Sequence, residues 1–243
     1  MADIARLIRL LDSEDADAWS RTLVSLAREQ GFDQVLYGAV SSRHAKLENA
    51  FVRSNYAPSW RAQYDAERLA YVDPTVIHCM TSSLPIVWSP QVFRTPAQRR
   101  LYESACAFGI RAGVTLPVHG PNGEFGVLSF ASDVRPDESF MRKVNDRIAD
   151  LSLIRDYVFT SAQRFCGEVQ ELAPRLTRRE LEVLNWVMAG KSSWEISRIT
   201  SCSEATINFH MANVRQKFNV NTRQQAVVKA ISLGLIIPED HHR

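Results

Sequence analysis

The chain has 243 residues, 45% of them hydrophobic and 23% charged, which suits one medium-sized domain plus one small domain. The formal net charge of +2 and four scattered cysteines exclude a strongly charged protein, a disulfide scaffold and a paired-cysteine zinc site. No apolar stretch approaches the length of a membrane span and no signal peptide opens the chain, so we expect a cytoplasmic protein without a membrane partner.

The first 160 residues alternate between helical and strand patterns. The predicted elements are a helix over 12–30 begun by Ser13, strands at 34–41 and 49–54, helices from about 59, from about 73 and over 96–108, strands at 113–119 and 124–132, and a helix over 137–160. A Gly-Pro-Asn-Gly turn separates the last two strands. This order favours an α+β fold whose N-terminal domain is an α/β/α sandwich around an antiparallel sheet.

An aromatic stripe lies in the middle of this domain. Tyr56, Trp60 and Tyr64 follow one another at intervals of four residues, with Asp73 and Trp88 farther along. Such stripes are more often core than binding site. However, a buried tyrosine or tryptophan needs a partner for its polar tip, and a carboxylate in an apolar stretch is costly unless it is paired. The stripe is therefore a candidate ligand site.

Polar residues then separate this domain from the rest of the chain. We predict a first domain over residues 1–162, a linker over 163–175 and a second domain over 176–243. Residues 174–243 hold ten Lys and Arg against six Asp and Glu, whereas the preceding residues hold nineteen against twenty-one. The basic excess in the second domain supports, without proving, a nucleic-acid-binding role.

The second domain begins with two capped helices. Thr177 and Glu180 form a capping-box pattern, and Gly190 is suited to end the first helix in a left-handed conformation. Ser192 or Ser193 is the expected cap of a second, short helix, which is predicted to bury Ile196 and Ile199. The buried face of the first helix is predicted to hold Leu181, Leu184, Val187 and Met188.

A third helix, capped by Ser203, presents two different faces. Its apolar seam consists of Ile207, Met211, Val214 and Phe218. Its opposite face carries Ala205, Asn208, Phe209, Ala212, Arg215 and Gln216. Small, amide and guanidinium side chains are what a helix needs to enter the major groove and contact base edges. Lys191, Arg215, Lys217 and Arg223 surround this face and could contact phosphates. A helical bundle with a merely solvated polar face is the less favoured alternative.

The second domain resembles the helix-turn-helix domain of LuxR-type transcription regulators. The matching residues are Thr177, Arg179, Glu180, Leu184, Gly190, Lys191, Ser192, Glu195, Ile196, Ser203, Thr206, Ile207, His210, Asn213, Lys217, Ala226, Leu233, Gly234 and Leu235. The resemblance implies a four-helix domain whose fourth helix, at about 222–233, supplies a dimer contact. It also implies that Asn208, Phe209 and Ala212 sit where relatives place their base-reading residues. The predicted DNA-binding set is Lys191, Ser203, Thr206, Asn208, Phe209, Ala212, Arg215 and Lys217.

The first domain resembles the autoinducer-binding domain of the same family. The shared runs are Asn55-Tyr56, Trp60, Tyr64, Val72-Asp73-Pro74-Thr75-Val76, His78-Cys79, Leu84-Pro85-Ile86, Trp88, Gly109, Thr115, Gly123-Glu124 and Leu128-Ser129. In DNA-binding members of this kind the ligand is an N-acyl-homoserine lactone, which implies a small-molecule ligand and no cofactor. Phe93 and Leu47 depart from a similar member, which has tyrosine there, so tail recognition differs.

The hydrogen-bonding capacity of the side chains suggests how a lactone would bind. Trp60 is a donor for the ring carbonyl, Asp73 an acceptor for the amide N–H, and Tyr56 and Ser129 are donors for the amide carbonyl or a 3-oxo group. Thr75 can orient Asp73 or hydrogen-bond the ligand. Trp88 is expected to pack against the ring, and Tyr64 and Thr115 are further candidate ligand-binding residues. The candidate acyl wall is Leu36, Gly38, Leu47, Ala50, Val52, Val76, Ile110, Leu116, Phe125 and Val127.

These features predict a ligand-dependent regulator of quorum sensing that binds a long-chain lactone, with or without a 3-oxo group, and a palindromic operator as a homodimer. RNA polymerase is a further expected partner, and the effect on transcription is either activation or repression. The alternative is an orphan module that binds DNA without lactone or through heterodimers. An enzyme is not expected, because the chain lacks a GxSxG elbow and an HxHxDH metal motif.

Overall fold

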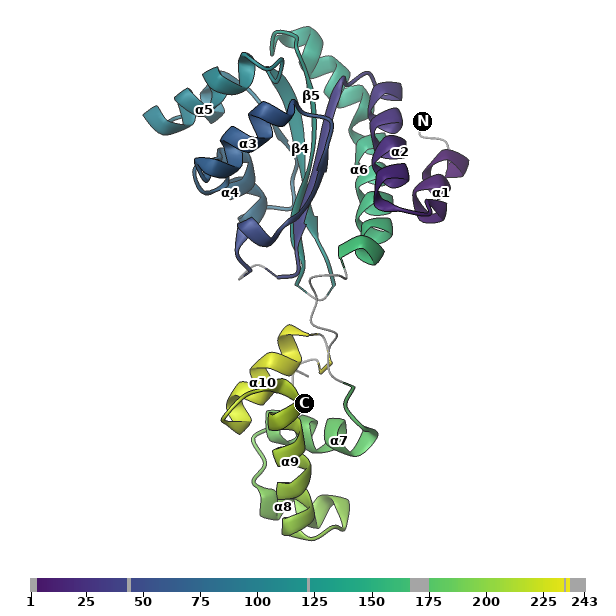
Figure 1. The fold of residues 1–243 in the computed structure, drawn as a ribbon, viewed down its shortest axis with the longest axis vertical. Coiled ribbons are helices and arrows are strands. Elements are labelled where there is room, and N and C mark those ends of the chain that lie inside the picture. The colour runs from purple at the N-terminus through teal and green to yellow at the C-terminus, as the bar shows by residue number, and fades with distance from the viewer. Residues whose placement is uncertain (1–3, 43–44, 122, 167–174, 234, 237–243) are drawn as a thin grey trace. The chain divides into compact units, whose positions relative to one another are not determined.

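The computed structural model describes residues 4–42, 45–121, 123–166, 175–233 and 235–236. The chain divides into two compact units, Met1–Val169 and Gln170–Arg243. Within the first unit, helices lie on both faces of one sheet, and the described part of the second unit is a group of helices (Figure 1). The predicted fold class is confirmed.

The sheet of the first unit has five strands, β1 (Gln34–Val40), β2 (Phe51–Ser54), β3 (Ile86–Val87), β4 (Ala112–His119) and β5 (Phe125–Ser132). Their order is β2-β1-β5-β4-β3, and every neighbouring pair is antiparallel. The four longer strands confirm the predicted ones. β3 was not predicted, because two residues are too few to show an alternating pattern.

The register aligns the candidate ligand residues across the sheet. Leu36 of β1 pairs with Ser129 of β5, and Ser129 pairs with Thr115 of β4. Two residues farther along β1, Gly38 pairs with Val127. Because side chains alternate between the faces of a sheet, these residues all lie on one face.

Helices cover that face and the opposite face (Figure 1). The ligand face carries α3 (Pro58–Ala66), α4 (Pro74–Thr81) and α5 (Pro96–Cys106), and the opposite face carries α1 (Ile4–Asp12), α2 (Ala16–Glu29) and α6 (Glu138–Cys166). Short 3-10 turns lie at Leu47–Asn49, Leu69–Tyr71 and Pro90–Val92.

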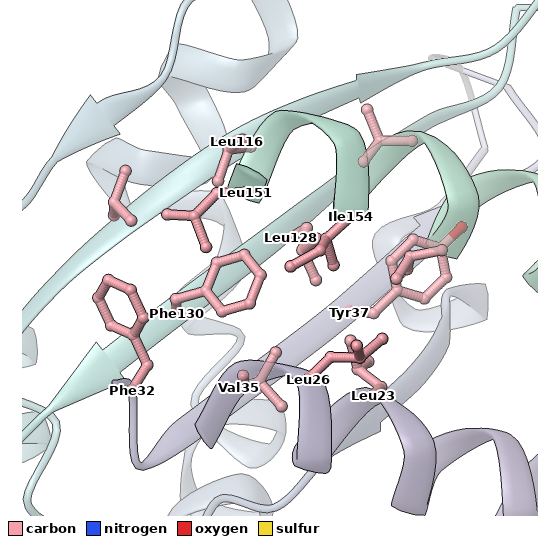
Figure 2. Close-up of a cluster of buried hydrophobic side chains, with 14 of the residues drawn as sticks. Leu23, Leu26, Phe32, Val35, Tyr37, Leu116, Leu128, Phe130, Leu151 and Ile154 are labelled. Atoms are coloured by element: carbon pink, nitrogen blue, oxygen red, sulfur yellow. The ribbon is translucent and has the colours of Figure 1, made fainter. Parts of the chain in front are cut away.

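The main core of this unit lies between the sheet and α1, α2 and α6. Phe130 and Leu128 of β5 pack here with Leu151 and Ile154 of α6 (Figure 2). Leu116 also lies in this core, so its assignment to the acyl wall was wrong. The reason is that Leu116 follows Thr115 directly in β4, and neighbouring strand residues point to opposite faces.

The helix limits near the start of the chain differ from the prediction. The predicted helix over 12–30 corresponds to α2, which begins only at Ala16, and α1 before it was not predicted. Helix α1 ends at Asp12, where the hydroxyl of Ser13 donates to the carbonyl of Arg9. The cap of α2 is Asp15, whose carboxylate accepts a hydrogen bond of 2.7 Å from Ala18 N–H. Ser13 therefore follows the end of α1 rather than beginning α2.

Helix α6 is longer than predicted. It continues to Cys166, past the expected end at 160 and into the predicted linker 163–175. A run of buried side chains, including Val158 and Ala162, keeps its last turns packed on the core. The remainder of the linker prediction falls mostly on residues 167–174, which lie outside the described residues.

The second unit contains α7 (Arg178–Met188), α8 (Ser193–Thr200), α9 (Glu204–Phe218) and α10 (Arg223–Ser232). The predicted caps are confirmed: Thr177 and Ser192 form capping boxes, and Ser203 accepts from Thr206 N–H. Gly190 adopts a φ of +80°, a conformation that suits glycine. These local signals explain why the helix order could be predicted.

The core of the second unit is centred on α9. The whole predicted seam, from Ile207 to Phe218, is buried together with Leu184 and Ile196. Ile199 was expected inside but is 45% exposed, whereas Ser197 is buried. Residues two apart on a helix lie about 200° apart, so a face that buries Ser197 turns Ile199 outward.

Candidate ligand-binding and DNA-binding sites

An aromatic cluster forms one end of the candidate ligand site. Tyr56, Trp60 and Trp88 are buried in it together with Ile110. Trp60 is 3% exposed, and its ring contacts the Tyr64 ring edge-on, with the ring centroids 5.9 Å apart. Ile110, predicted for the acyl wall, therefore lies among the aromatic residues rather than with the tail candidates.

Asp73 is the centre of the polar part of the site. One carboxylate oxygen accepts from the backbone N–H and the hydroxyl of Thr75, at 2.8 and 2.7 Å, and caps α4. The other accepts from the hydroxyl of Tyr64 at 2.9 Å. Burial raises the pKa of Asp73 above its ordinary value, although these hydrogen bonds act in the opposite direction. Arg61, the cation that lies over the Tyr64 ring, forms its ion pair with Asp65 rather than with this carboxylate.

A hydrogen-bonded chain runs across the sheet beside Asp73. The indole N–H of Trp88 donates to the hydroxyl of Thr115 at 2.9 Å, and that hydroxyl lies 2.9 Å from the hydroxyl of Ser129. Because the Thr115 oxygen already accepts from Trp88, its hydrogen is available for Ser129. Ser129 can then donate its own hydrogen to another group.

Gly113 lets Trp88 lie against β4. A β-carbon at Gly113 would come within 2.6 Å of the Trp88 ring, closer than atoms can approach. The backbone N–H of Trp88 also donates to the Gly113 carbonyl at 2.7 Å. The sequence reasoning missed Gly113. Its only signal was a glycine inside a strand pattern, which often marks a close approach by another group.

Two donors of the aromatic cluster remain without protein partners. The buried hydroxyl of Tyr56 has no hydrogen-bond partner among the described residues. The indole N–H of Trp60 makes no hydrogen bond to the described residues either, but it is not among the fully buried unpaired atoms. Burial raises the pKa of Tyr56, which keeps the phenol protonated and able to donate. Unsatisfied buried polar atoms are uncommon and call for an explanation.

An apolar cluster forms the other end of the site. Phe125, Leu47, Ala50, Val76 and Val127, all predicted for the acyl wall, pack here, and Val40, Cys79 and Met80, which were not predicted, join them. Gly38 and Val52 pair on the same face, and a β-carbon at Gly38 would lie 3.7 Å from Val52. Leu36 packs on the aromatic cluster instead. The polar residues thus lie between two apolar ends.

A short strap crosses the apolar end. Leu47 and Glu48 belong to the 3-10 turn Leu47–Asn49. The carboxylate of Glu48 accepts from the hydroxyl of Tyr71 at 2.8 Å and lies 3.6 Å from the guanidinium of Arg68. These contacts tie the strap that carries Leu47 to the turn before α4.

The second unit presents the predicted recognition surface on α9. Asn208, Phe209 and Ala212 are exposed, and Phe209 is 62% exposed although it is aromatic. The hydroxyl of Ser193, from α8, donates to the side-chain oxygen of Asn208 at 2.7 Å. At the start of the helix the hydroxyl oxygens of Ser203 and Thr206 lie 2.8 Å apart, and the Ser203 hydroxyl also accepts from the backbone N–H of Thr206 as the N-cap.

The cations around this surface have protein partners. Lys217 lies 2.6 Å from the buried carboxylate of Glu180 and also donates to the Arg175 carbonyl. Arg215 donates to the Asn221 carbonyl at 3.2 Å, and Lys191 lies 3.7 Å from Glu195. Lys217 is therefore engaged inside its own unit, whereas the longer Lys191 contact is weaker.

No group of three or more metal-binding side chains occurs in the described part of the chain. None of its helices is both long enough and apolar enough to cross a membrane.

The fold and the two sites define a class: a small-molecule-responsive regulator with a separate helix-turn-helix unit. Residues 15–162 match the family described as "Autoinducer binding domain", and residues 174–230 match "Bacterial regulatory proteins, luxR family". The chain belongs to the LuxR family of bacterial transcription regulators. The family is one of regulators rather than enzymes.

Known proteins resemble nearly the whole chain. The transcriptional activator AnoR of Acinetobacter nosocomialis is 31% identical over 92% of this chain and 94% of its own length. The quorum-sensing regulator RhlR of Pseudomonas aeruginosa is 32% identical over 86% of each. The structure of SdiA with octanoyl-rac-glycerol has a TM-score of 0.77 and 25% identity, covering 98% of this chain and 100% of SdiA. The chain is thus a quorum-sensing transcription regulator that combines autoinducer binding with DNA binding.

Proposed function

We propose that the autoinducer is an N-acyl-homoserine lactone. The single observation that carries this proposal is the polarity of the site between the two apolar ends. Asp73 is an acceptor with neutral hydrogen-bond donors around it, while Trp60, Tyr56 and Ser129 have hydrogens to donate. An amide with one N–H and one carbonyl, attached to the ring of a lactone that carries its own carbonyl, matches this set.

Each polar atom of the head group then has a defined partner. The lactone carbonyl accepts from the indole of Trp60, and the amide N–H donates to Asp73. The amide carbonyl accepts from the hydroxyls of Tyr56 and Ser129. Ser129 can donate to the ligand when it accepts from Thr115, whose oxygen in turn accepts from Trp88. Trp88 lies over Gly113 and closes the ring side of the site. Thr75 and Tyr64 hold Asp73 in place.

The acyl chain extends toward the apolar cluster. Val76, Val127 and Phe125 line this end, and the strap carrying Leu47 lies over it. Gly38 leaves one side of the path free of a side chain. Burying a methylene group stabilises by about 0.8 kcal/mol, so each carbon that fits should raise the affinity several-fold. Chain-length preference follows from how many carbons this end accommodates.

Ligand binding controls DNA binding through folding and dimer formation. A ligand that binds only the folded unit stabilises it in proportion to its concentration over its Kd. A homodimer carries two α9 helices, which fit a palindromic operator with half-sites about 34–36 Å apart. RNA polymerase is the downstream partner of the bound dimer.

The test is expression with and without a panel of lactones, from four to fourteen acyl carbons in steps of about two. Soluble yield and melting temperature are measured for each. Octanoyl glycerol, the compound bound to SdiA, serves as the matched non-lactone lipid. A gain that depends on chain length and is larger for lactones supports the proposal.

The competing hypothesis is the orphan module. It predicts a soluble chain that binds DNA equally with and without lactone. The set of Tyr56, Trp60, Asp73 and Ser129, together in one site, argues against it. A lactone-independent melting temperature together with lactone-independent DNA binding would overturn the lactone proposal.

A further inference from the structure

One hydrogen bond fixes the amide of the candidate base-reading residue. The hydroxyl of Ser193, the first residue of α8, donates to the side-chain oxygen of Asn208 at 2.7 Å. Asn208 lies on the exposed face of α9, next to Phe209 and four residues before Ala212. The bond therefore joins the two helices of the helix-turn-helix at its recognition face.

The orientation of this amide limits which base it can recognise. An asparagine that reads adenine uses its oxygen and its nitrogen together, accepting from N6–H and donating to N7. An amide oxygen has two lone pairs, so this bond does not exhaust its capacity to accept, but it turns the oxygen toward Ser193 of α8. As long as this bond is kept, Asn208 presents its NH2 group, a donor only, to DNA.

We propose that Ser193 is a positioning residue that makes Asn208 a reader of guanine. Guanine presents two acceptors, N7 and O6, and no donor in the major groove, so it suits an amide that offers only hydrogens. The proposal rests on the function proposed above, because it requires α9 to enter the major groove. It adds which base edge is read and which residue sets that preference.

The neighbouring side chains are compatible with this assignment. Phe209 and Ala212 are exposed beside Asn208 and offer apolar contact to bases rather than a competing hydrogen bond. Ser193 is only partly exposed, so its hydroxyl acts mainly through Asn208. Substituting it removes no buried side chain from the core.

The test uses full-length protein produced with a lactone that raises its solubility. A randomised double-stranded DNA library is first selected with the wild type to obtain a site. Affinity is then measured for variants of that site in which each guanine is changed to adenine or to 7-deazaguanine, which lacks the N7 acceptor. The proteins are the wild type, Asn208→Ala, Ser193→Ala and Gln224→Ala. Gln224 is an exposed amide on α10 and serves as the matched control.

The expected result is specific to one base position per half-site. There, replacing guanine should weaken wild-type binding roughly 5- to 100-fold, and Asn208→Ala should abolish this discrimination. Ser193→Ala should reduce the preference for guanine over adenine at the same position, because the freed amide can turn and contact both atoms of adenine. Gln224→Ala should keep the wild-type preference.

Two results would overturn the inference while leaving the proposed function standing. One is a selected site whose every guanine is discriminated equally by the wild type and Asn208→Ala. The other is an unchanged guanine preference in Ser193→Ala. If the lactone-bound wild type selects no sequence at all, the proposed function itself fails, and this inference with it.

Discussion

Two carboxylates withdrawn from solvent, one in each unit, show how differently the units are built. Asp73 accepts from neutral donors, among them Tyr64 and Thr75, and burial raises its pKa. Glu180 is 2% exposed and lies 2.6 Å from the ammonium of Lys217. Burial alone would raise the pKa of Glu180, but Lys217 and the cap hydrogen bonds of Thr177 hold it below its ordinary value.

The comparison separates a structural carboxylate from a binding one. Glu180 forms an ion pair with Lys217 of its own unit, and this pair joins α7 to α9. Asp73 accepts hydrogen bonds from a backbone N–H and two hydroxyls but forms no ion pair among the described residues, so a further donor would still stabilise its charge. The carboxylate of the candidate ligand site thus keeps capacity for a hydrogen bond from a ligand, whereas the carboxylate of the second unit already has its ion-pair partner.

The largest expected effect is on the Asp73 side of this comparison. Asp73→Ala removes the cap of α4 and leaves the Tyr64 and Thr75 hydroxyls without their acceptor. We expect a loss of about 3–5 kcal/mol in the unfolding free energy of the first unit. Urea denaturation without lactone measures it, because a bound lactone would add its own loss of affinity to the difference. Asp65→Ala, which removes only the exposed pair with Arg61, should cost under about 1 kcal/mol.

On the Glu180 side, Lys217→Met should destabilise the second unit by about 2–3 kcal/mol, because it strands a buried carboxylate. The side chain of Lys217 is 33% exposed, which places the value below that of a fully buried pair. Hydrogen exchange of the α7 and α9 amides reports the change. Adding Glu180→Gln should recover part of the loss, and Lys191→Met, at a looser surface pair, should change little. Equal effects of both lysines would contradict a structural role for Lys217.

Trp60→Phe should have a smaller effect, confined to the ligand. It keeps an aromatic ring beside Tyr64 and Phe108 but removes one donor. The loss of one hydrogen bond corresponds to about 10-fold weaker lactone binding. Calorimetric titration tests this, with Phe108→Leu as a control that alters packing alone. If Trp60→Phe binds the lactone as tightly as the wild type, the lactone carbonyl does not accept a hydrogen bond from this indole.

The smallest effects should be the opposite pH responses of the two units. Because the pKa of Asp73 is raised, acidification protonates it earlier than an exposed aspartate, so lactone affinity should fall while the unliganded first unit is relatively stabilised. Because the pKa of Glu180 is lowered, its contribution to the second unit is present above the ordinary glutamate pKa and lost as pH falls through the lowered value. Hydrogen exchange at several pH values distinguishes the two. A common direction in both units would disprove the contrast.

The two units also differ in how far the sequence predicted them. In the second unit the signals are local: Thr177, Ser192 and Ser203 cap helices within three residues, and the seam of α9 repeats at helical spacing. Only Ile199 was misplaced, because an eight-residue helix has too few apolar residues to fix its buried face.

In the first unit the sequence predicted the residue types of the site but not their partners. The bonds from Tyr64 to Asp73 and from Trp88 to Thr115 join different elements, so no spacing along the chain reveals them. Leu116 does not line the acyl wall because neighbouring residues of a strand point to opposite faces of the sheet, and Thr115 already points to the ligand face. The role of Gly113 could not be predicted, because it depends on where the Trp88 ring lies after folding.

The central claim is that Asp73 accepts the amide N–H of the ligand. Its most direct test compares an acyl-homoserine lactone with the ester in which oxygen replaces that N–H, at the same chain length. Calorimetric Kd values of both ligands are measured for the wild type and for Asp73→Asn. We expect the wild type to bind the amide at least about 10-fold more tightly, and Asp73→Asn to lose most of this difference. Equal affinity of the wild type for amide and ester would contradict the account.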